Sequence, residues 1–576
     1  MTQTRRVLFL GLLCTALWCP TACGDDGNTN TAEPPTDAGT VPDTDQPDGD
    51  DPPDTIDTPD ADEPPPNRVI EPRPDGDFAA RNADVLGCLT GALDQTLATG
   101  AVVGFMEDGQ VVTIDGYGQR SLDSQEPVGP ETLFRFGSVL KMMTSAAALS
   151  YVDDGTLALH QDIREVRPEL DFEQQPDGAM SLHMLMSHQG GMIDELTLNG
   201  TLEDQGLEDF LTSADFLDIL FHAPPGTFYN YSNPNFYLAG LLIEQASGQF
   251  YREAITERVF EPLGMDRTVF RAQDVLDDGD HALGTTTGLL GDQAVAVDAW
   301  ENTWARPAGL GWTSMDNLLR FGSFLMAGNE DVLSQESWQL MRTGQVNVSG
   351  PGQIDQYGYG VIVQRGLFTG TNQFRDVLTL FHDGSTGDFT SLLYTLPETG
   401  FAMAAMVNGP SGPVIDCMIP ALVREAARYP LTQAPDALQP TPETFEQYVG
   451  QWVQTAPLGT LPVFYIGYDG QNLTALVPAW EEQGFDYTRR LRPTSQDNFL
   501  LETSNGTLPM TGIRDANGDL THLRSRIAVS RKATEGSGKA RPPTNPQHIQ
   551  KGWEAIRSKA RPIDHLRNLH LPGLHP

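Results

Sequence analysis

Ser138 and Lys141 are the residues of this sequence best suited to nucleophilic chemistry. They lie just after Gly137, and the chain then runs into an apolar, alanine-rich stretch over residues 142–149. We predict a helix that begins at Ser138, which places Lys141 one turn further along the same face. Free backbone N–H groups at a helix start can stabilise an oxyanion, and a lysine kept neutral by burial can accept the serine proton. The alternative is a capped helix with a solvated lysine, since S-x-x-K also arises by chance.

Two later motifs carry further polar groups. Tyr231-x-Asn233 lies in a polar, turn-rich loop before a predicted helix over residues 236–246, where a phenol and an amide can converge on a cleft. His382-Asp383-Gly384-Ser385 stands between two strand-like segments. Neither motif is informative alone, because both residue patterns are common in turns.

The histidines of the sequence do not suggest a metal site. His183 and His188 are five residues apart and so do not share a helix face in the way zinc-binding i, i+4 pairs do. We interpret His188 as a structural residue that closes a turn. We predict neither a metal ion nor another cofactor.

The three motifs in this order resemble the serine β-lactamase and D-Ala-D-Ala carboxypeptidase superfamily, in its class C-like, esterase-like branch. Tyr231 follows Lys141 by about ninety residues, and His382 follows Asn233 by about one hundred and fifty. Supporting matches are Ser187-His188-Gln189-Gly190-Gly191, Glu261-Pro262-Leu263-Gly264-Met265 and the segment 307–314. The resemblance covers roughly residues 78 to 428.

The resemblance implies a role for each motif residue. Ser138 would be the acylated nucleophile, Lys141 and Tyr231 would share its proton, and Tyr231 would later activate the deacylating water. Asn233 would hold the substrate and steady Lys141. The backbone N–H groups of Ser138 and Ser385 would form the oxyanion hole. The substrate-binding and oxyanion set would therefore comprise Asn233, His382, Gly384 and Ser385.

The third motif departs from true β-lactamases, which usually have Lys-Thr-Gly there. His382 provides less positive field than lysine for a carboxylate-bearing substrate, and strand alternation would aim Asp383 away from His382. We therefore expect a serine hydrolase acting on esters or amides of small molecules or peptides. A true β-lactamase or D-Ala-D-Ala carboxypeptidase is one alternative. A slowly deacylating penicillin-binding or sensor protein is the other.

The segments around these motifs predict an α+β fold. A helix over residues 77–98 has Val85, Leu86, Leu89, Leu93 and Leu97 on one face, and a hairpin of strands 101–106 and 110–114 turns at Asp108-Gly109. Strand-like segments recur at 357–363, 378–381, 390–394 and 401–407 before a helix over 411–427. We expect an antiparallel sheet flanked by helices, with a mostly helical second lobe, as in β-lactamases and transpeptidases.

The chain of 576 residues is long enough for several domains. We assign residues 77–430 to the hydrolase domain. Residues 444–532 show short strands and Asp-Gly and Asn-Gly turns, which predict a small all-β barrel or sandwich resembling a lipocalin-like appendage. Residues 533–576 form a basic tail that we expect to be disordered. The formal net charge of -42 argues against nucleic acid as a partner, and the sequence predicts no particular oligomeric state.

The N-terminus predicts export. Residues 1–22 combine Arg5-Arg6 with a short apolar run and resemble a bacterial lipoprotein signal, with Cys23 as the lipid-bearing residue. An ordinary secretory signal cut nearby is the alternative. Residues 23–76 are rich in Asp, Glu and Pro and form an extended, disordered linker. We therefore expect a protein of the bacterial cell envelope, periplasmic or at the cell surface, which meets the membrane only through its lipid anchor.

Two cysteines remain in the exported part of the chain, Cys88 and Cys417. The residues alone leave two possibilities, a disulfide or two buried thiols. In the fold of the superfamily the first and last helices of the domain pack together, and these helices contain the two cysteines. The resemblance therefore implies a Cys88–Cys417 disulfide.

Overall fold

The computed structural model describes residues 69–194, 201–286, 293–295, 297, 301–348, 355–434, 442–456, 463–503, 506–515, 517–525 and 528–533. The predicted signal peptide, the lipidation site Cys23, nearly all of the predicted linker and the basic tail lie outside the described residues. In the part of the chain that is described, no helix combines the length and apolarity needed to cross a membrane.

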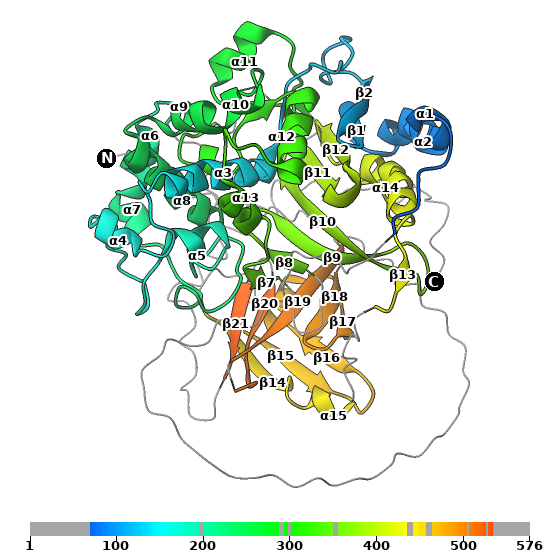
Figure 1. The fold of residues 1–576 in the computed structure, drawn as a ribbon. Coiled ribbons are helices and arrows are strands. Elements are labelled where there is room, and N and C mark those ends of the chain that lie inside the picture. The colour runs from blue at the N-terminus through cyan, green and yellow to red at the C-terminus, as the bar shows by residue number, and fades with distance from the viewer. Residues whose placement is uncertain are drawn as a thin grey trace, which may run out of the picture.

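A nine-stranded antiparallel sheet forms the centre of the first domain (Figure 1). Its order is β2-β1-β12-β11-β10-β9-β8-β7, and β13 pairs with one end of β10. The first hairpin pairs with the last long strand, Ala101 opposite Val407, so both ends of the domain contribute strands as predicted. In chain order the strands are β1 (Gly100–Glu107), β2 (Gln110–Gly118), β7 (Val346–Asn347), β8 (Asp355–Tyr357), β9 (Ile362–Phe368), β10 (Phe374–Ser385), β11 (Thr390–Leu396), β12 (Phe401–Val407) and β13 (Leu431–Thr432).

Alternation along the strands divides the core into two layers. On β1, Val102 and Met106 face the helical lobe, whereas Val103 and Phe105 face the opposite side, where α2 (Ala83–Ala92) and α14 (Gly412–Ala426) pack. All four side chains are at most 3% exposed. The sheet is therefore buried on both faces, and α12 (Met315–Ala327) covers the face opposite α14.

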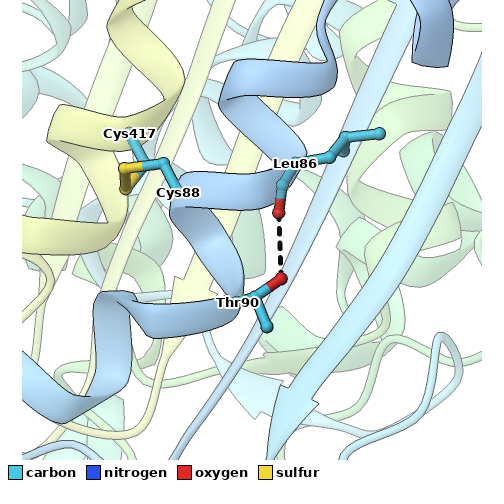
Figure 2. The surroundings of a disulfide bond; sticks show 4 residues. All are labelled: Leu86, Cys88, Thr90 and Cys417. Carbon is cyan, nitrogen blue, oxygen red and sulfur yellow. Dashed lines mark hydrogen bonds between the residues drawn. A yellow bond between two sulfur atoms is a disulfide. The ribbon is translucent and has the colours of Figure 1, made fainter.

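The two terminal helices are joined covalently. Cys88 of α2 and Cys417 of α14 form a disulfide with their Cα atoms 5.5 Å apart (Figure 2). This confirms the predicted pairing. The residues just before α1 (Phe78–Arg81) lie against the same region, since the guanidinium of Arg73 donates hydrogen bonds to the carboxylate of Glu425 at 2.9 and 3.0 Å.

The helical lobe lies on the far side of the sheet from α14 and contains most of the segments between β2 and β7 (Figure 1). Its main helices are α3 (Leu140–Asp153) and α8 (Asn233–Ser247), which pack against each other and are almost wholly buried. The shorter ones are α4 (Ile163–Val166), α5 (Leu182–Met186), α6 (Gly206–Leu211), α7 (Ala214–Leu217), α9 (Tyr251–Ile255), α10 (Glu261–Leu263), α11 (Ala272–Asp278) and α13 (Gln335–Met341).

The α+β prediction is confirmed, with three local corrections. The segment predicted as one strand over 357–363 is split between β8 and β9 at Gly360, which has φ +72° and lies against the backbone of Lys141. The strand predicted at 378–381 is longer and includes His382 to Ser385, because these residues pair with β11. Leu97, predicted on the buried face of the first helix, lies beyond it and is 48% exposed.

The second domain is a closed antiparallel barrel of eight strands. It runs from β14 (Gly450–Gln454) through β15 (Val463–Tyr468), β16 (Leu473–Leu476), β17 (Tyr487–Ser495), β18 (Asn498–Thr503), β19 (Gly506–Arg514) and β20 (Leu520–Ser525) to β21 (Ala528–Lys532). Pairing of Trp452 with Lys532 closes it. The small all-β unit expected from the sequence is thus a barrel, and it lies beside the β7–β8 end of the sheet (Figure 1).

Candidate active site

The nucleophile loop joins a short strand to helix α3. Strand β3 (Phe134–Arg135) pairs with β6 (Trp312–Thr313), and the chain then enters a single 3₁₀ turn, η2 (Gly137–Val139), before α3 begins. Gly137 has φ +51°, and a Cβ built on it would lie 2.6 Å from the backbone nitrogen of Ser385. Glycine is therefore required at this turn. The turn leaves Ser138 half-buried at the start of the helix, as predicted.

Lys141 is completely buried and reaches back to Ser138. Its Nζ lies 3.0 Å from Ser138 Oγ, 2.7 Å from Asn233 Oδ1 and 2.6 Å from the carbonyl oxygen of Ala308. The two oxygen acceptors hold the amine in place, and the contact with Ser138 is short enough for direct proton transfer. The solvated lysine of the alternative interpretation is therefore excluded.

Tyr231 lies on the other side of the amine. Lys141 Nζ lies over the ring of Tyr231, 5.0 Å from the ring centre. The Tyr231 ring also packs against His188, and the centres of the two rings are 4.1 Å apart. His188 Nδ1 accepts a hydrogen bond from the backbone N–H of Ser232 at 3.2 Å. His188 is thus a buried structural residue that holds the Tyr231 loop.

Asn233 begins α8, and its amide is oriented by a residue that the sequence did not single out. Asp194 Oδ1 accepts hydrogen bonds from both the backbone N–H and the side-chain Nδ2 of Asn233, each 2.9 Å long. With Nδ2 engaged there, the Asn233 carbonyl oxygen points to Lys141. Asp194 lies 39 residues from Asn233, so no local spacing could have indicated the contact.

His382 is buried in strand β10 at 2% exposure. Its Nε2 lies 2.9 Å from the hydroxyl of Tyr357 and its Nδ1 2.5 Å from the carbonyl oxygen of Asp383. Asp383 lies on the opposite face of the strand, as predicted from alternation, since Leu380 faces the helical lobe and Phe381 faces α14.

Gly384 brings strand β10 against the nucleophile loop. A Cβ at Gly384 would lie 2.4 Å from the carbonyl oxygen of Phe136 and 3.1 Å from the backbone nitrogen of Ser138. Ser391 Oγ on β11 donates to the same Phe136 carbonyl at 2.7 Å. The backbone nitrogens of Ser138 and Ser385 therefore approach each other around Gly384, which is the arrangement that an oxyanion hole needs.

A buried charge cluster supports the Ala308 carbonyl that binds Lys141. Ala308 ends the 3₁₀ turn η4 (Arg306–Ala308), and Arg306 is 2% exposed. Its guanidinium pairs with Glu301 at 3.0 Å and with Asp204 at 2.6 Å. The sequence indicates this segment only as a supporting match to the family, because the acceptor is a backbone carbonyl that any residue supplies.

A buried carboxyl group lies in the turn that follows strand β10. Asp388, in the turn between β10 and β11, is 2% exposed. Burial raises the pKa of its carboxyl group, and the positive charge of Arg135, next to the nucleophile loop, opposes that rise. Thr386 Oγ1 donates to Asp388 at 2.7 Å. The attraction between Arg135 and Asp388 connects the β10–β11 turn to β3, the strand that leads into Ser138.

The described residues contain no group of three or more His, Cys, Asp or Glu side chains that could hold a metal ion. The structure brings the predicted site residues together. Ser138, Lys141 and Asn233 are in direct contact, and the ring centres of Tyr231 and His382 are 6.2 Å apart. Gly384 and Ser385 lie against the nucleophile loop.

A serine and a buried lysine at a helix start, beneath an antiparallel sheet, define a class of acyl-transfer proteins. The chain belongs to the β-lactamase family, whose sequence profile matches residues 87–428, more than half of the chain. The resemblance to the β-lactamase superfamily, stated from the motifs, is thereby confirmed, whereas the class C-like, esterase-like branch stays a prediction.

Individual relatives are distant. The chain is similar to "Protein flp" of Staphylococcus aureus (strain MRSA252), 25% identical over 314 residues, 54% of this chain and 59% of that protein. It is also similar to a D-aminopeptidase of Gluconobacter oxydans (strain 621H), 27% identical over 272 residues, 46% of this chain and 48% of that protein. The chain thus spans between about half and three-fifths of the length of these relatives.

Solved structures support the fold of both domains. SurE superimposes with a TM-score of 0.59 at 22% identity, covering 80% of this chain and all of SurE. The octameric penicillin-binding protein homologue from Pyrococcus abyssi gives 0.52 at 21% identity, covering 78% of this chain and 99% of that chain. The aligned part of this chain, 80% and 78% of its length, is longer than the hydrolase domain alone, so the structural similarity extends into the barrel.

Proposed function

We propose that the protein is a serine hydrolase that works through a covalent acyl-enzyme on Ser138. The observation that carries this proposal is the position of Lys141, fully buried with its amine 3.0 Å from Ser138 Oγ and held by Asn233 and Ala308. A lysine that only supported the fold would not need its amine at hydrogen-bond distance from a half-buried serine.

In the first half-reaction Ser138 Oγ attacks the substrate carbonyl carbon, and its proton passes to the neutral amine of Lys141 or to the phenolate of Tyr231. The negative charge that develops on the carbonyl oxygen is stabilised by the N–H groups of Ser138 and Ser385. The tetrahedral intermediate then expels the alcohol or amine, which takes up the proton. The acyl group remains as an ester on Ser138.

In the second half-reaction Tyr231 removes a proton from a water molecule, which attacks the ester carbonyl. The intermediate collapses, Ser138 Oγ regains a proton, and a carboxylic acid leaves. Asn233 holds the substrate near the amine and also anchors Lys141. This cycle needs no group beyond the side chains and N–H groups already named.

We propose esters or amides without a carboxylate next to the scissile bond as substrates, either small molecules or peptides. Support comes from His382, which is buried between the Tyr357 phenol and a backbone carbonyl. It supplies less positive charge than a lysine would to a carboxylate-bearing substrate. One relative carries the name D-aminopeptidase, which supports testing amides of D-amino acids beside esters.

The test compares purified wild type with Ser138→Ala on a p-nitrophenyl ester, a D-amino acid p-nitroanilide and nitrocefin. We expect turnover of the ester or the anilide that depends on Ser138, with slower turnover of nitrocefin. Preferential turnover of nitrocefin would favour a true β-lactamase. A long-lived adduct of penicillin on Ser138 without turnover of any substrate would favour a penicillin-binding or sensor protein.

We propose further that the protein is exported and tethered to the cell envelope through a lipid on Cys23, with the acidic linker as a spacer. The Cys88–Cys417 disulfide supports an oxidising compartment, because disulfides persist mainly outside the cytosol. Metabolic labelling with an alkyne fatty acid should label wild type and not Cys23→Ser. Equal labelling of the two proteins would contradict the lipid anchor.

A further inference from the structure

Arg524 lies on barrel strand β20, yet its side chain reaches into the hydrolase domain. It is 8% exposed. One guanidinium nitrogen donates to the carbonyl oxygen of Tyr229 and the other to the carbonyl oxygen of Val348. The guanidinium carbon also lies 4.9 Å from the centre of the Tyr229 ring. A planar donor fork of this kind fixes two backbone segments at once.

The burial of this cation is costly, since its hydrogen-bond partners are carbonyl groups and not carboxylates. Burial lowers the pKa of Arg524 to about 10, and Tyr229 opposes the change. That pKa still leaves the guanidinium charged at neutral pH, so all of its donors are retained.

The two segments to which Arg524 donates hydrogen bonds, at Tyr229 and Val348, both lead to the active site. Tyr229 is two residues before Tyr231, whose ring faces Lys141. Val348 follows β7, the partner of the strand that ends at Tyr357, and the Tyr357 hydroxyl contacts His382. The rings of Tyr229, Tyr231 and Tyr357 belong to one buried cluster, with the Tyr229 and Tyr357 centres 5.4 Å apart.

We propose that Arg524 is a positioning residue for Tyr231, so that the barrel completes the active site instead of being an inert appendage. This inference rests on the proposed role of Ser138, Lys141 and Tyr231. From the hydrolase domain the Tyr231 loop is tethered by Asn230, whose backbone N–H donates to the carbonyl oxygen of His188 at 2.7 Å and whose Nδ2 donates to the carbonyl oxygen of Met192 at 3.1 Å. From the barrel it is tethered by Arg524, and without this fork the Tyr231 phenol would lose its fixed position relative to Lys141.

The barrel has other contacts with the hydrolase domain, so loss of Arg524 alone should not undock it. Val529 packs with Ala223 and Phe228 in a small apolar cluster. His222 Nδ1 lies 3.0 Å from Thr455 Oγ1 of the barrel domain. Variants at Arg524 should therefore fold and keep the barrel in place.

The experiment is a double-mutant cycle on the full chain. Arg524→Met and Arg524→Lys are made in wild type and in Tyr231→Phe, and Arg490→Met, an exposed arginine of the same barrel, is the control. The readout is the rate constant for labelling of Ser138 by a fluorophosphonate. It is determined from the time course of the chains that become labelled, so that unfolded chains do not contribute. Partial unfolding then lowers the amplitude of labelling and leaves the rate constant unchanged.

We expect Arg524→Met to lower the rate constant by between about tenfold and a hundredfold in wild type, and by less than about twofold in Tyr231→Phe. Arg524→Lys should recover part of the rate, and Arg490→Met should have no effect. An unchanged rate, or an equal fall in both backgrounds, would overturn the inference. If Arg524→Met does not fold, Arg524→Lys replaces it. An unchanged rate constant for Arg524→Lys, or an equal fall in wild type and in Tyr231→Phe, would then overturn the inference. Failure of wild type to label would refute the proposed function itself.

Discussion

Gly384→Ala tests the oxyanion hole with a single methyl group. The new Cβ would lie 2.4 Å from the Phe136 carbonyl oxygen and 2.3 Å from Ser391 Oγ. Gly384 is not among the glycines with positive φ, so alanine is allowed by the backbone and the effect is one of space alone.

The size of the effect follows from these distances. Ordinary Cβ contacts begin at 3.4 Å, so strand β10 and the nucleophile loop must separate by about 1 Å. A misplacement of that size costs about a hundredfold in rate, and loss of one oxyanion donor costs a similar factor. We expect kcat/KM to fall by at least about a hundredfold, while overpacking lowers the free energy of unfolding by about 1–3 kcal/mol.

The assay compares steady-state kinetics on a p-nitrophenyl ester with the urea unfolding midpoint for each variant. Gly412→Ala is the matched control, because a Cβ there meets nothing within 4 Å. Adding Ser391→Ala should not restore activity, since the remaining clash is with the Phe136 backbone. Activity of Gly384→Ala within about twofold of wild type would refute the reasoning.

Three further predictions concern stability. Cys417→Ser should lower the free energy of unfolding by about 2–4 kcal/mol, measured in urea, and a reducing agent should then have no further effect. Arg306→Met leaves the carboxylate of Glu301 buried without its partner and should cost about 3–5 kcal/mol, together with slower acylation. Burial, then the charge of His522, lowers the pKa of His222 to about 4. Stability from this residue should therefore be complete above about pH 6.5 and should be lost as the pH falls towards 4, by about 2 kcal/mol at pH 5. His222→Gln should reduce the fall of the urea midpoint between about pH 6.5 and pH 4, and the part due to His183, whose pKa is also lowered to about 4 by burial, should remain. Unchanged urea midpoints in these variants would contradict the corresponding contacts.

The sequence predicted the residues whose chemistry depends on their own side chains. A serine, a lysine three residues on, a tyrosine and an asparagine are recognisable because few other residue types could take their places. Lys141 and Asn233 illustrate this, since their predicted contact is present at 2.7 Å.

The supporting contacts could not be predicted in the same way. Ala308 contributes a backbone carbonyl, which every residue has, and Asp194 is one of 78 acidic residues with no distinguishing neighbour. Arg524 acts across 295 residues of sequence on Tyr229. Such contacts follow from how the chain folds and not from a local pattern.

Element boundaries failed where tertiary contacts override local preference. Apart from its two glycines, the run from Tyr357 to Val363 consists of residues with strand propensity, but close approach of Gly360 to the Lys141 backbone interrupts it. The polar residues from His382 to Ser385 have weak strand propensity and yet extend β10, because β11 offers them partners. Closure of the barrel likewise depends on the pairing of Trp452 with Lys532, which no short pattern encodes.

The most direct test of the central claim is intact-mass analysis after treatment with a fluorophosphonate. We expect one adduct per chain on wild type, located on Ser138 by peptide mapping, and none on Ser138→Ala. Lys141→Met should fold and label far more slowly, because the amine 3.0 Å from Ser138 Oγ is lost. Absence of labelling on folded wild type, or equal labelling of Ser138→Ala, would contradict acyl-enzyme chemistry at Ser138.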